Sequence, residues 1–340
     1  MVWRALRGRT RAEPEAQPPP PAPREPWPTE PNPMHAPARS RIRPRVLALA
    51  AFALALLFGA AELAARALGV LDFPLYRLDP DTVYVVAPSQ NGTFFGGRTW
   101  AYNEYGMSGG PLTGGRSGKV LVVGDSVVEG GFGTDRREKV QGRLADILPG
   151  RVWSIATGGW AFLNEVAWLK RHRDLLTQFD TLVLVCNSAD FEGYGPWSAA
   201  GYPVSRPVSA LIYAAQRRFF ADGPPDLGVY SPALTDEMRA GWRHVLGGFD
   251  GRILIVKHSL APELSSRHPG FEAVVAELVA LSSGRAEVVE AASDPRWNAA
   301  LYKDIVHITP QGNAVMAAII ADALGRSDQH AARRDAPLRP

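Results

Sequence analysis

Two short segments of the chain carry residues that could perform nucleophilic catalysis. The first is Gly124-Asp125-Ser126, and the second is Asp304-Ile-Val-His307. A serine hydroxyl is a weak nucleophile unless a neighbouring base removes its proton, and a histidine oriented by a carboxylate is such a base. We therefore predict that Ser126 attacks a substrate, that His307 accepts its proton, and that Asp304 orients and stabilises the His307 ring.

Each segment alone has a simpler interpretation. Asp125 or Ser126 could only cap a helix, because both side chains accept hydrogen bonds from the free N–H groups of a first helical turn. Asp304 and His307 could likewise cap the last helix of the chain. The catalytic interpretation depends on the two segments occurring together, since each supplies the group that the other lacks.

Between these two segments, short apolar runs alternate with stretches of helical spacing. The runs predict strands at residues 119–125, 152–157, 181–186, 252–257 and 286–290. The helical stretches are residues 138–148, 162–176, 271–282 and 311–324, with two more helices near 206–220 and 235–247. Alternating strands and helices imply parallel strands joined by right-handed crossovers, so we predict a three-layer α/β/α sandwich. Ser126 would then follow the first strand, at the edge of the sheet where ligands bind.

The two motifs also resemble a known family. GDSVVEG (residues 124–130) and DIVHITPQG (residues 304–312) are similar, in this order, to the first and last sequence blocks of the SGNH (GDSL-like) hydrolases. The similarity covers about residues 103–324. It implies a flavodoxin-like sandwich with five parallel strands, and hydrolysis or transfer of acyl groups through an acyl-serine. This chemistry needs no metal and no organic cofactor.

The resemblance further implies an oxyanion hole with three hydrogen-bond donors. The first two are the backbone N–H of Ser126 and that of Gly159, for which Gly158 is the neighbour that could be confused with it. The third is the side chain of an asparagine after the third strand, where this sequence has Ala189-Asp190 instead of the usual Asn-Asp. Either Asn187 supplies the amide or that donor is missing, and losing one donor costs about 10² to 10³ in rate.

Several other residues have a structural alternative to a functional role. The insertion at residues 188–250 is rich in aromatics, which could line an acyl or sugar site or could pack in the core. His258 and His268 follow the fourth strand without an evident carboxylate partner, so we expect surface or structural histidines. The aromatics of the insertion are Phe191, Tyr194, Trp197, Tyr202, Phe219 and Phe220.

Charge and cysteine content exclude some classes of function. The net charge is only +3, and nine arginines against four glutamates in the first 45 residues account for most of the basic excess. No basic stripe with interleaved aromatics follows, so nucleic acid is not an expected partner.

Cys186 is the single cysteine, which excludes an intramolecular disulfide and a Cys-based zinc site. Its apolar surroundings predict a small core residue.

The N-terminal part predicts a membrane anchor. Residues 1–45 are rich in Pro and Arg and cannot bury enough apolar surface to fold, so we predict a disordered tail. Residues 46–61 are uninterruptedly apolar, and with Glu62 and Arg66 at the far interface the helix would span the roughly 30 Å hydrocarbon core. We predict a single-pass helix over residues 46–70 of the inner (cytoplasmic) membrane. The arginines before it hold the N-terminus in the cytoplasm and send the rest of the chain to the periplasm.

Two alternatives to this anchor stay open. Gly59 and Ala61 are small residues that could precede the cleavage site of a signal peptide. The apolar run could also be a buried helix of a soluble protein. In addition, Met34 is a second candidate start of translation, which would leave a shorter basic leader.

The predicted organisation and function follow from these parts. A disordered tail (1–45) precedes the anchor (46–70), an irregular lead-in (71–118), the hydrolase domain (119–325) with its insertion (188–250), and a second tail (326–340). We expect a serine esterase that hydrolyses carboxylic esters, O-acyl or O-acetyl, of envelope carbohydrate or lipid. One alternative is a cell-surface polysaccharide O-acetyltransferase with the same triad. The other, suggested by Ala189, is a degenerate domain that binds glycans without catalysis.

Overall fold

Three segments of the chain are described by the computed structural model: residues 43–131, 133–219 and 231–334. The chain divides into two compact units, Met1–Ala53 and Leu54–Pro340. Nearly all of the predicted disordered tail lies outside the described residues, as do Met34 and Phe220. The predicted sandwich and its site belong to the second unit.

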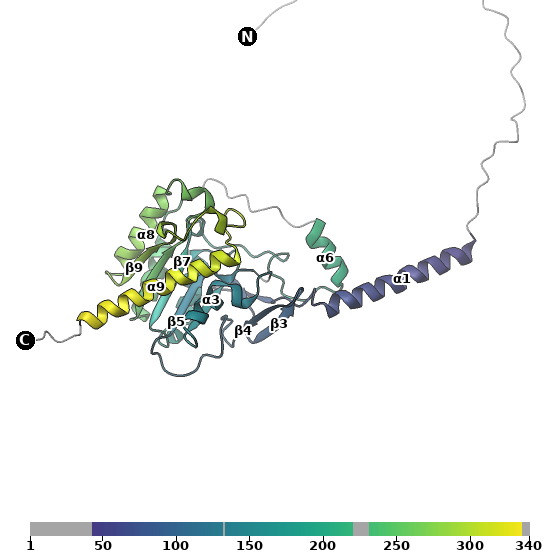
Figure 1. The fold of residues 1–340 in the computed structure, drawn as a ribbon, viewed down its shortest axis with the longest axis horizontal. Coiled ribbons are helices and arrows are strands. Elements are labelled where there is room, and N and C mark those ends of the chain that lie inside the picture. The colour runs from purple at the N-terminus through teal and green to yellow at the C-terminus, as the bar shows by residue number, and fades with distance from the viewer. Residues whose placement is uncertain (1–42, 132, 220–230, 335–340) are drawn as a thin grey trace, which may run out of the picture. The chain divides into compact units, whose positions relative to one another are not determined.

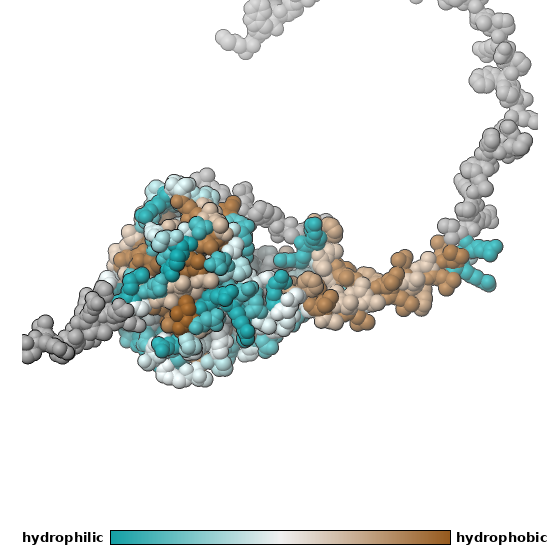
Figure 2. Space-filling view, viewed as in Figure 1, coloured by the Kyte–Doolittle hydropathy of each residue, from teal (hydrophilic) through white to brown (hydrophobic). Residues whose placement is uncertain are grey.

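Helix α1 (Pro44–Ala67) covers the predicted transmembrane run. None of its residues is buried, and Figure 2 shows apolar side chains along its surface. Among the described helices, α1 is the one that is long and apolar enough to cross a membrane. By length and composition, the chain therefore carries a candidate membrane span near its N-terminus.

Five parallel strands form the central sheet, in the order β6-β5-β7-β8-β9. Their bounds agree with the five predicted strands to within one residue at each end: β5 (Val120–Gly124), β6 (Val152–Ala156), β7 (Thr181–Cys186), β8 (Arg252–Lys257) and β9 (Ala286–Glu290). Counted along the chain, the second of these strands lies outside the first, which is the flavodoxin-like order. The predicted α/β/α sandwich is confirmed.

Alternate residues of each central strand face opposite layers of helices. In β7, Val183 and Val185 belong to one buried cluster, and Leu182 and Leu184 belong to the other. Both faces are thus covered, which explains why β5, β6 and β7 are buried along their whole length and largely apolar in sequence, whereas the edge strand β9 is not. The first cluster includes residues of α2 (Ser126–Glu129), α3 (Val140–Ile147) and α9 (Pro310–Arg334), and the second includes residues of α4 (Phe162–Arg171), α7 (Asp236–Gly248) and α8 (Pro269–Leu281). Figure 1 shows α3 and α9 side by side over the strands.

The lead-in at residues 71–118 is not irregular as predicted, because it contains two antiparallel hairpins. They are formed by β1 (Tyr76–Asp79) with β2 (Val83–Val86), and by β3 (Gln90–Phe94) with β4 (Arg98–Tyr102). Strands of four or five residues give too short a pattern to be recognised between turn residues. A bridge between Ser108 and Ser154 then pairs the lead-in with the outer edge of β6.

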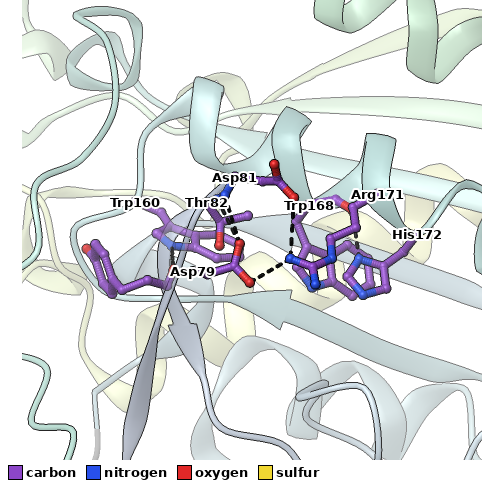
Figure 3. Close-up of polar contacts among 8 residues, drawn as sticks. Asp79, Asp81, Thr82, Trp160, Trp168, Arg171 and His172 are labelled. Atoms are coloured by element: carbon purple, nitrogen blue, oxygen red, sulfur yellow. Dashed lines mark hydrogen bonds and ion pairs between the residues drawn. The ribbon is translucent and has the colours of Figure 1, made fainter.

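The β1–β2 hairpin is fastened at its turn to helix α4. The Asp79 carboxylate accepts hydrogen bonds from the backbone N–H groups of Asp81 and Thr82, at 3.0 and 3.1 Å, which closes the turn. Figure 3 shows Arg171 reaching from α4 to both carboxylates, at 2.7 Å from Asp79 and 3.3 Å from Asp81. The lead-in is thereby attached to the sandwich that follows it in the chain.

The predicted helices are present, with differences at their ends. The helix predicted at 162–176 is two helices, α4 and α5 (Arg173–Leu176), separated at His172. In the insertion, α6 (Ala210–Phe219) and α7 match the two helices predicted there. Helix α9 continues to Arg334 and so enters the segment predicted as a C-terminal tail.

Candidate active site

The structure brings Ser126, His307 and Asp304 together beyond the carboxyl end of β5. The Ser126 Oγ lies 2.8 Å from the His307 Nε2, although the two residues are 181 positions apart in the chain. The other ring nitrogen of His307, Nδ1, lies 2.9 and 3.0 Å from the two carboxylate oxygens of Asp304. A proton on Nδ1 held by Asp304 leaves Nε2 as the acceptor that faces the serine hydroxyl.

The turn from β5 into α2 presents the serine. The Asp125 side chain caps α2 by accepting a hydrogen bond from the Val127 N–H at 2.8 Å, so the capping interpretation holds for Asp125 and leaves the Ser126 hydroxyl free for His307. A Cβ at Gly124 would lie 2.6 Å from the Val128 side chain and 3.1 Å from the Val185 carbonyl. Glycine is required there because α2 packs directly against the end of the strand.

The loop that carries Asp304 and His307 is stabilised by the Asp304 carboxylate itself. One oxygen of this carboxylate accepts from the backbone N–H groups of Val306, at 3.0 Å, and of His307, at 2.7 Å. Partial burial acts to raise the pKa of Asp304, but these hydrogen bonds and that of the His307 ring outweigh it and lower the pKa. Asp304 therefore stays ionised to lower pH than an ordinary aspartate and can stabilise a protonated His307.

His258 also supports the loop that carries Asp304 and His307. Its Nε2 lies 2.7 Å from the Val306 carbonyl oxygen, and the Ala261 N–H donates to the Ile305 carbonyl at 2.8 Å. The His258 ring is fully buried and stacks on Tyr302 with 5.5 Å between ring centroids. Burial lowers the pKa of His258 to about 4, so the ring is neutral at pH 7. His258 is a structural histidine, and His268 caps the first turn of α8.

Two backbone donors are free at the site. Within the described residues, neither the Ser126 N–H nor the Gly159 N–H has a hydrogen-bond acceptor. Gly159 has a φ of +70°, and a Cβ there would lie 2.4 Å from the Tyr202 hydroxyl oxygen and 2.9 Å from that of Tyr84. Together with Ser126 and His307, Gly159 lines a pocket of about 430 Å³. Both N–H groups therefore lie where they could stabilise an oxyanion on a substrate held beside Ser126.

Asn187 does not offer a free amide to this pocket. Its Nδ2 donates to the Asp125 carboxylate at 3.1 Å and to the Asp190 carboxylate at 3.0 and 3.1 Å. Its Oδ1 accepts from the Ala189 N–H at 2.9 Å, which fixes the orientation of the amide. Both amide hydrogens are used, and Ala189 carries only a methyl group. Of the two alternatives that the sequence left open, this arrangement favours the missing third donor.

Three buried carboxyl groups lie at or near the pocket, two of which, Asp125 and Asp190, line it. Asp125, Glu165 and Asp190 are at most 6% exposed, and burial raises the pKa of all three. Neither side-chain oxygen of Glu165 has a hydrogen-bond partner in the described part of the chain. Sequence reasoning missed Glu165, although its position was a signal: it lies three residues after Phe162 and four before Leu169, on the apolar face of α4.

The lead-in holds the loop that carries Gly159. The Tyr84 hydroxyl donates to the Gly158 carbonyl at 2.7 Å, and the Trp160 indole N–H donates to the Tyr84 carbonyl at 2.8 Å. Tyr84 also stacks on Tyr202 of the insertion, with ring centroids 4.6 Å apart. Tyr84 was not predicted from the sequence, because nothing in an isolated tyrosine of the lead-in indicates contact with residues some 75 positions later.

The aromatics of the insertion divide between core and pocket. Phe191 is buried in the core, whereas Trp197 and Tyr202 are partly buried against it. Of the six predicted aromatics, Tyr194 lines the pocket beside Ser126, and Phe219 is 74% exposed. Cys186 is buried at the end of β7, as expected of a core residue.

Comparison with known proteins gives matches among solved structures alone. No protein-family model matches the chain, and no curated protein matches it in sequence. A carbohydrate esterase family 2 enzyme of Corynascus thermopiles (Myceliophthora fergusii) is 12% identical with a TM-score of 0.38, over 64% of this chain and 68% of that one. The catalytic domain of peptidoglycan O-acetyltransferase A of Streptococcus pneumoniae is 13% identical with a TM-score of 0.36, over 63% and 97%.

A member of the lipolytic G-D-S-L family from Veillonella parvula is 14% identical with a TM-score of 0.34, over 61% of this chain and 98% of that one. The last of these three structures carries the G-D-S-L name of the family that the sequence motifs resemble. Because these identities and TM-scores are low, we base the function on the geometry of the site.

Proposed function

We propose that this protein is a membrane-anchored serine esterase that cleaves O-acyl esters through an acyl-serine. One observation carries the proposal: the Ser126 hydroxyl lies 2.8 Å from a histidine nitrogen whose partner nitrogen faces the Asp304 carboxylate. This is the arrangement of nucleophile, base and orienting carboxylate that serine hydrolases share on unrelated folds. A degenerate glycan-binding domain would not need the three side chains to be hydrogen-bonded in series.

Each residue of the triad has a role in the first half of the reaction. Ser126 Oγ attacks the carbonyl carbon of the ester while His307 Nε2 takes the hydroxyl proton. The carbonyl oxygen becomes an oxyanion, which the N–H groups of Ser126 and Gly159 stabilise. When the tetrahedral intermediate collapses, the alcohol leaves with the proton from His307, and the acyl group stays on Ser126. Asp304 remains ionised throughout and stabilises the protonated ring.

Water completes the cycle. His307 takes a proton from a water molecule, and the resulting hydroxide attacks the acyl carbon. The second tetrahedral intermediate collapses to the carboxylic acid and the free serine, which recovers its proton from His307. If a sugar hydroxyl replaces water in this step, the same triad transfers the acyl group, so esterase and O-acetyltransferase differ in the acceptor that reaches His307.

Five of the residues that line the pocket are small and leave space beside Ser126 for the acyl group of a substrate: Gly159, Ala161, Ala189, Gly193 and Gly195. We propose that the substrate is an O-acyl or O-acetyl ester of an envelope carbohydrate or lipid. The envelope location follows from α1 as a span, with the arginines before it in the cytoplasm and the sandwich in the periplasm.

A fluorophosphonate probe tests the proposal directly. It should label wild-type protein at Ser126, and Ser126→Ala and His307→Ala should lose the labelling together with hydrolysis of p-nitrophenyl acetate. A correctly folded wild-type protein that neither reacts with the probe nor releases p-nitrophenol would contradict an esterase or a transferase. Acetate release in the presence and absence of an added glycan acceptor separates these two, because only a transferase moves the acetyl group onto the glycan.

A further inference from the structure

Helix α6 presents a row of apolar side chains to solvent. Val208, which directly precedes the helix cap, is 92% exposed, Ile212 is 55% exposed and Phe219 is 74% exposed. At about 100° per residue, Ile212 and Phe219 lie within roughly 20° of one another around the helix axis, so they share one face of α6. We call these two residues, together with Val208 just before the helix, the α6 stripe.

The opposite face of α6 is packed on the lead-in. Ala210 and Tyr213 are buried in a small cluster with Leu71 and Phe73, and the rings of Phe73 and Tyr213 stack with their centroids 4.9 Å apart. The helix is thus fixed on one side, so the exposure of its stripe is a consequence of a defined orientation. Burying such a stripe would be favourable, at about 25 cal/mol for each Å² removed from water.

The N-terminus of α6 is capped by the last part of α1. The Glu62 carboxylate accepts hydrogen bonds from the Ser209 hydroxyl at 2.9 Å, the Ala210 N–H at 2.8 Å and the Leu211 N–H at 3.0 Å. Arg66 pairs with Glu62 at 2.6 Å and also donates to the Val208 carbonyl. The two charges that end the apolar run of α1 are therefore the residues that hold the start of α6.

This contact sets the depth of α6 in the membrane. The apolar run of α1 ends at Ala61, so Glu62 and Arg66 must lie at the boundary between hydrocarbon and head groups if α1 spans the bilayer. The first turn of α6 then lies at the same boundary. Its last turn carries Arg217 and Arg218, cations of the kind that anionic lipid head groups attract.

We propose that α6 lies on the outer surface of the membrane that α1 crosses, with the α6 stripe inserted among the head groups. This inference rests on the proposed anchor. An amphipathic helix with an apolar stripe and basic flanks binds in this way, parallel to the membrane. The insertion that contains α6 also supplies Tyr194 and Pro196 to the pocket wall. The membrane contact and the pocket are therefore two parts of one chain segment.

Single-cysteine labelling tests this contact in the full-length protein. Cys186 is the single native cysteine and is buried, so reagents added to folded protein should report introduced cysteines. We would label Ile212→Cys and Phe219→Cys with an environment-sensitive fluorophore in vesicles that contain anionic lipid. Ile147→Cys on α3, where the native side chain is 48% exposed, is the matched control. Alkaline-carbonate washing establishes anchoring, and p-nitrophenyl acetate hydrolysis establishes activity.

The expected result is several-fold weaker quenching by aqueous iodide at positions 212 and 219 than at position 147, with strong quenching by lipids that carry a shallow nitroxide. Equal iodide quenching at all three positions in carbonate-resistant protein would overturn the inference and leave the anchor standing. Protection from iodide without quenching by nitroxide lipids would mean that a protein covers the stripe, which also overturns it. Release by carbonate would refute the anchor and the inference together, whatever the esterase activity.

Discussion

For the reaction proposed at Ser126, the number of hydrogen-bond donors to the oxyanion decides how fast catalysis can be. Within the residues that the structure describes, the backbone N–H groups of Ser126 and Gly159 have no acceptor, whereas the Asn187 amide is held by Asp125 and Asp190. Breaking the hydrogen bonds between the Asn187 amide and these two carboxyl groups costs free energy, because a buried carboxyl group that loses a hydrogen-bond donor is left unsatisfied. The proposed reaction therefore has two backbone donors for the oxyanion in this arrangement of the site.

Replacing Asn187 with alanine separates a structural from a catalytic role. Because Asp125 and Asp190 lose the amide that bonds them, we expect Asn187→Ala to lower the free energy of unfolding by about 1–3 kcal/mol. We expect the kcat of the folded fraction to change less than tenfold. Urea unfolding and kinetics on the same preparation give both quantities. A loss of about 10² or more in kcat with unchanged stability would instead make Asn187 an oxyanion donor.

Ala189 offers the converse experiment, since this residue lines the pocket with Ser126 and Gly159. An amide introduced there can point to the substrate oxyanion, and a third donor is worth up to about 10² in kcat. We expect Ala189→Asn to raise kcat by about tenfold or more. Ala189→Leu is the control: its side chain is similar in size to that of asparagine but has no N–H group, so it should not raise kcat. Equal effects of the two substitutions would show that filling the pocket, and not donating to the oxyanion, changes the rate.

Among the elements, the lead-in hairpins have a larger part in the site than their short strands suggest. The β1–β2 hairpin bonds to α4 at its turn and, through Tyr84, to the loop that carries Gly159. In turn the Asn164 side chain accepts from the Ala161 N–H at 2.9 Å and from the Gly195 N–H at 2.7 Å, which joins this loop to the insertion. The Gly159 N–H, the second donor in the proposed reaction, is thus positioned by residues outside the five-stranded sandwich.

Removing one hydroxyl group tests this support. Tyr84→Phe keeps the ring that stacks on Tyr202 but loses the hydrogen bond to the Gly158 carbonyl. If that bond positions the Gly159 N–H, kcat should fall by about three- to tenfold, as expected for about 1 kcal/mol, while KM stays nearly constant. Tyr76→Phe, a buried tyrosine of the same cluster without a hydrogen bond to this loop, is the control. A rise in KM without a fall in kcat would indicate a role in binding instead.

The elements also show which features the sequence could predict. The five strands were predicted to within one residue because β5, β6, β7 and β8 are largely apolar and buried, and the edge strand β9 still carries Val288 and Val289 between turn residues. Ser126 and His307 were predicted because serine chemistry requires both groups at one edge of the sheet. Tyr84 and Glu165 were not, since their roles arise from contacts between distant segments. The lead-in hairpins were missed because short strands between turns, with Val83 and Ser89 at positive φ, give no regular alternation.

For the molecule as a whole, the buried titratable groups make stability depend on pH in opposite directions. The raised pKa values of Asp125, Glu165 and Asp190 mean that the folded state holds protons that the unfolded state releases, so these groups stabilise the fold more as pH falls. His258 acts in the other direction. Its pKa is about 4 in the folded state against an ordinary 6.5. Between pH 6.5 and 4, the unfolded state therefore binds a proton that the folded state does not bind.

The contribution of His258 is isolated by comparing the wild type with His258→Gln, whose amide can still donate to the Val306 carbonyl. The stability that neutral His258 contributes is fully present above pH 6.5 and is lost as pH falls toward 4. At 1.36 kcal/mol per pKa unit, the loss amounts to about 3 kcal/mol. We therefore expect the unfolding free energy of the wild type, relative to that of the variant, to decrease by about this amount between pH 7 and 4.

Urea unfolding of both full-length proteins in detergent, followed by tryptophan fluorescence at several pH values, measures the difference. Parallel curves for the two proteins would mean that His258 binds a proton equally in both states, and the neutral buried ring described above would be wrong.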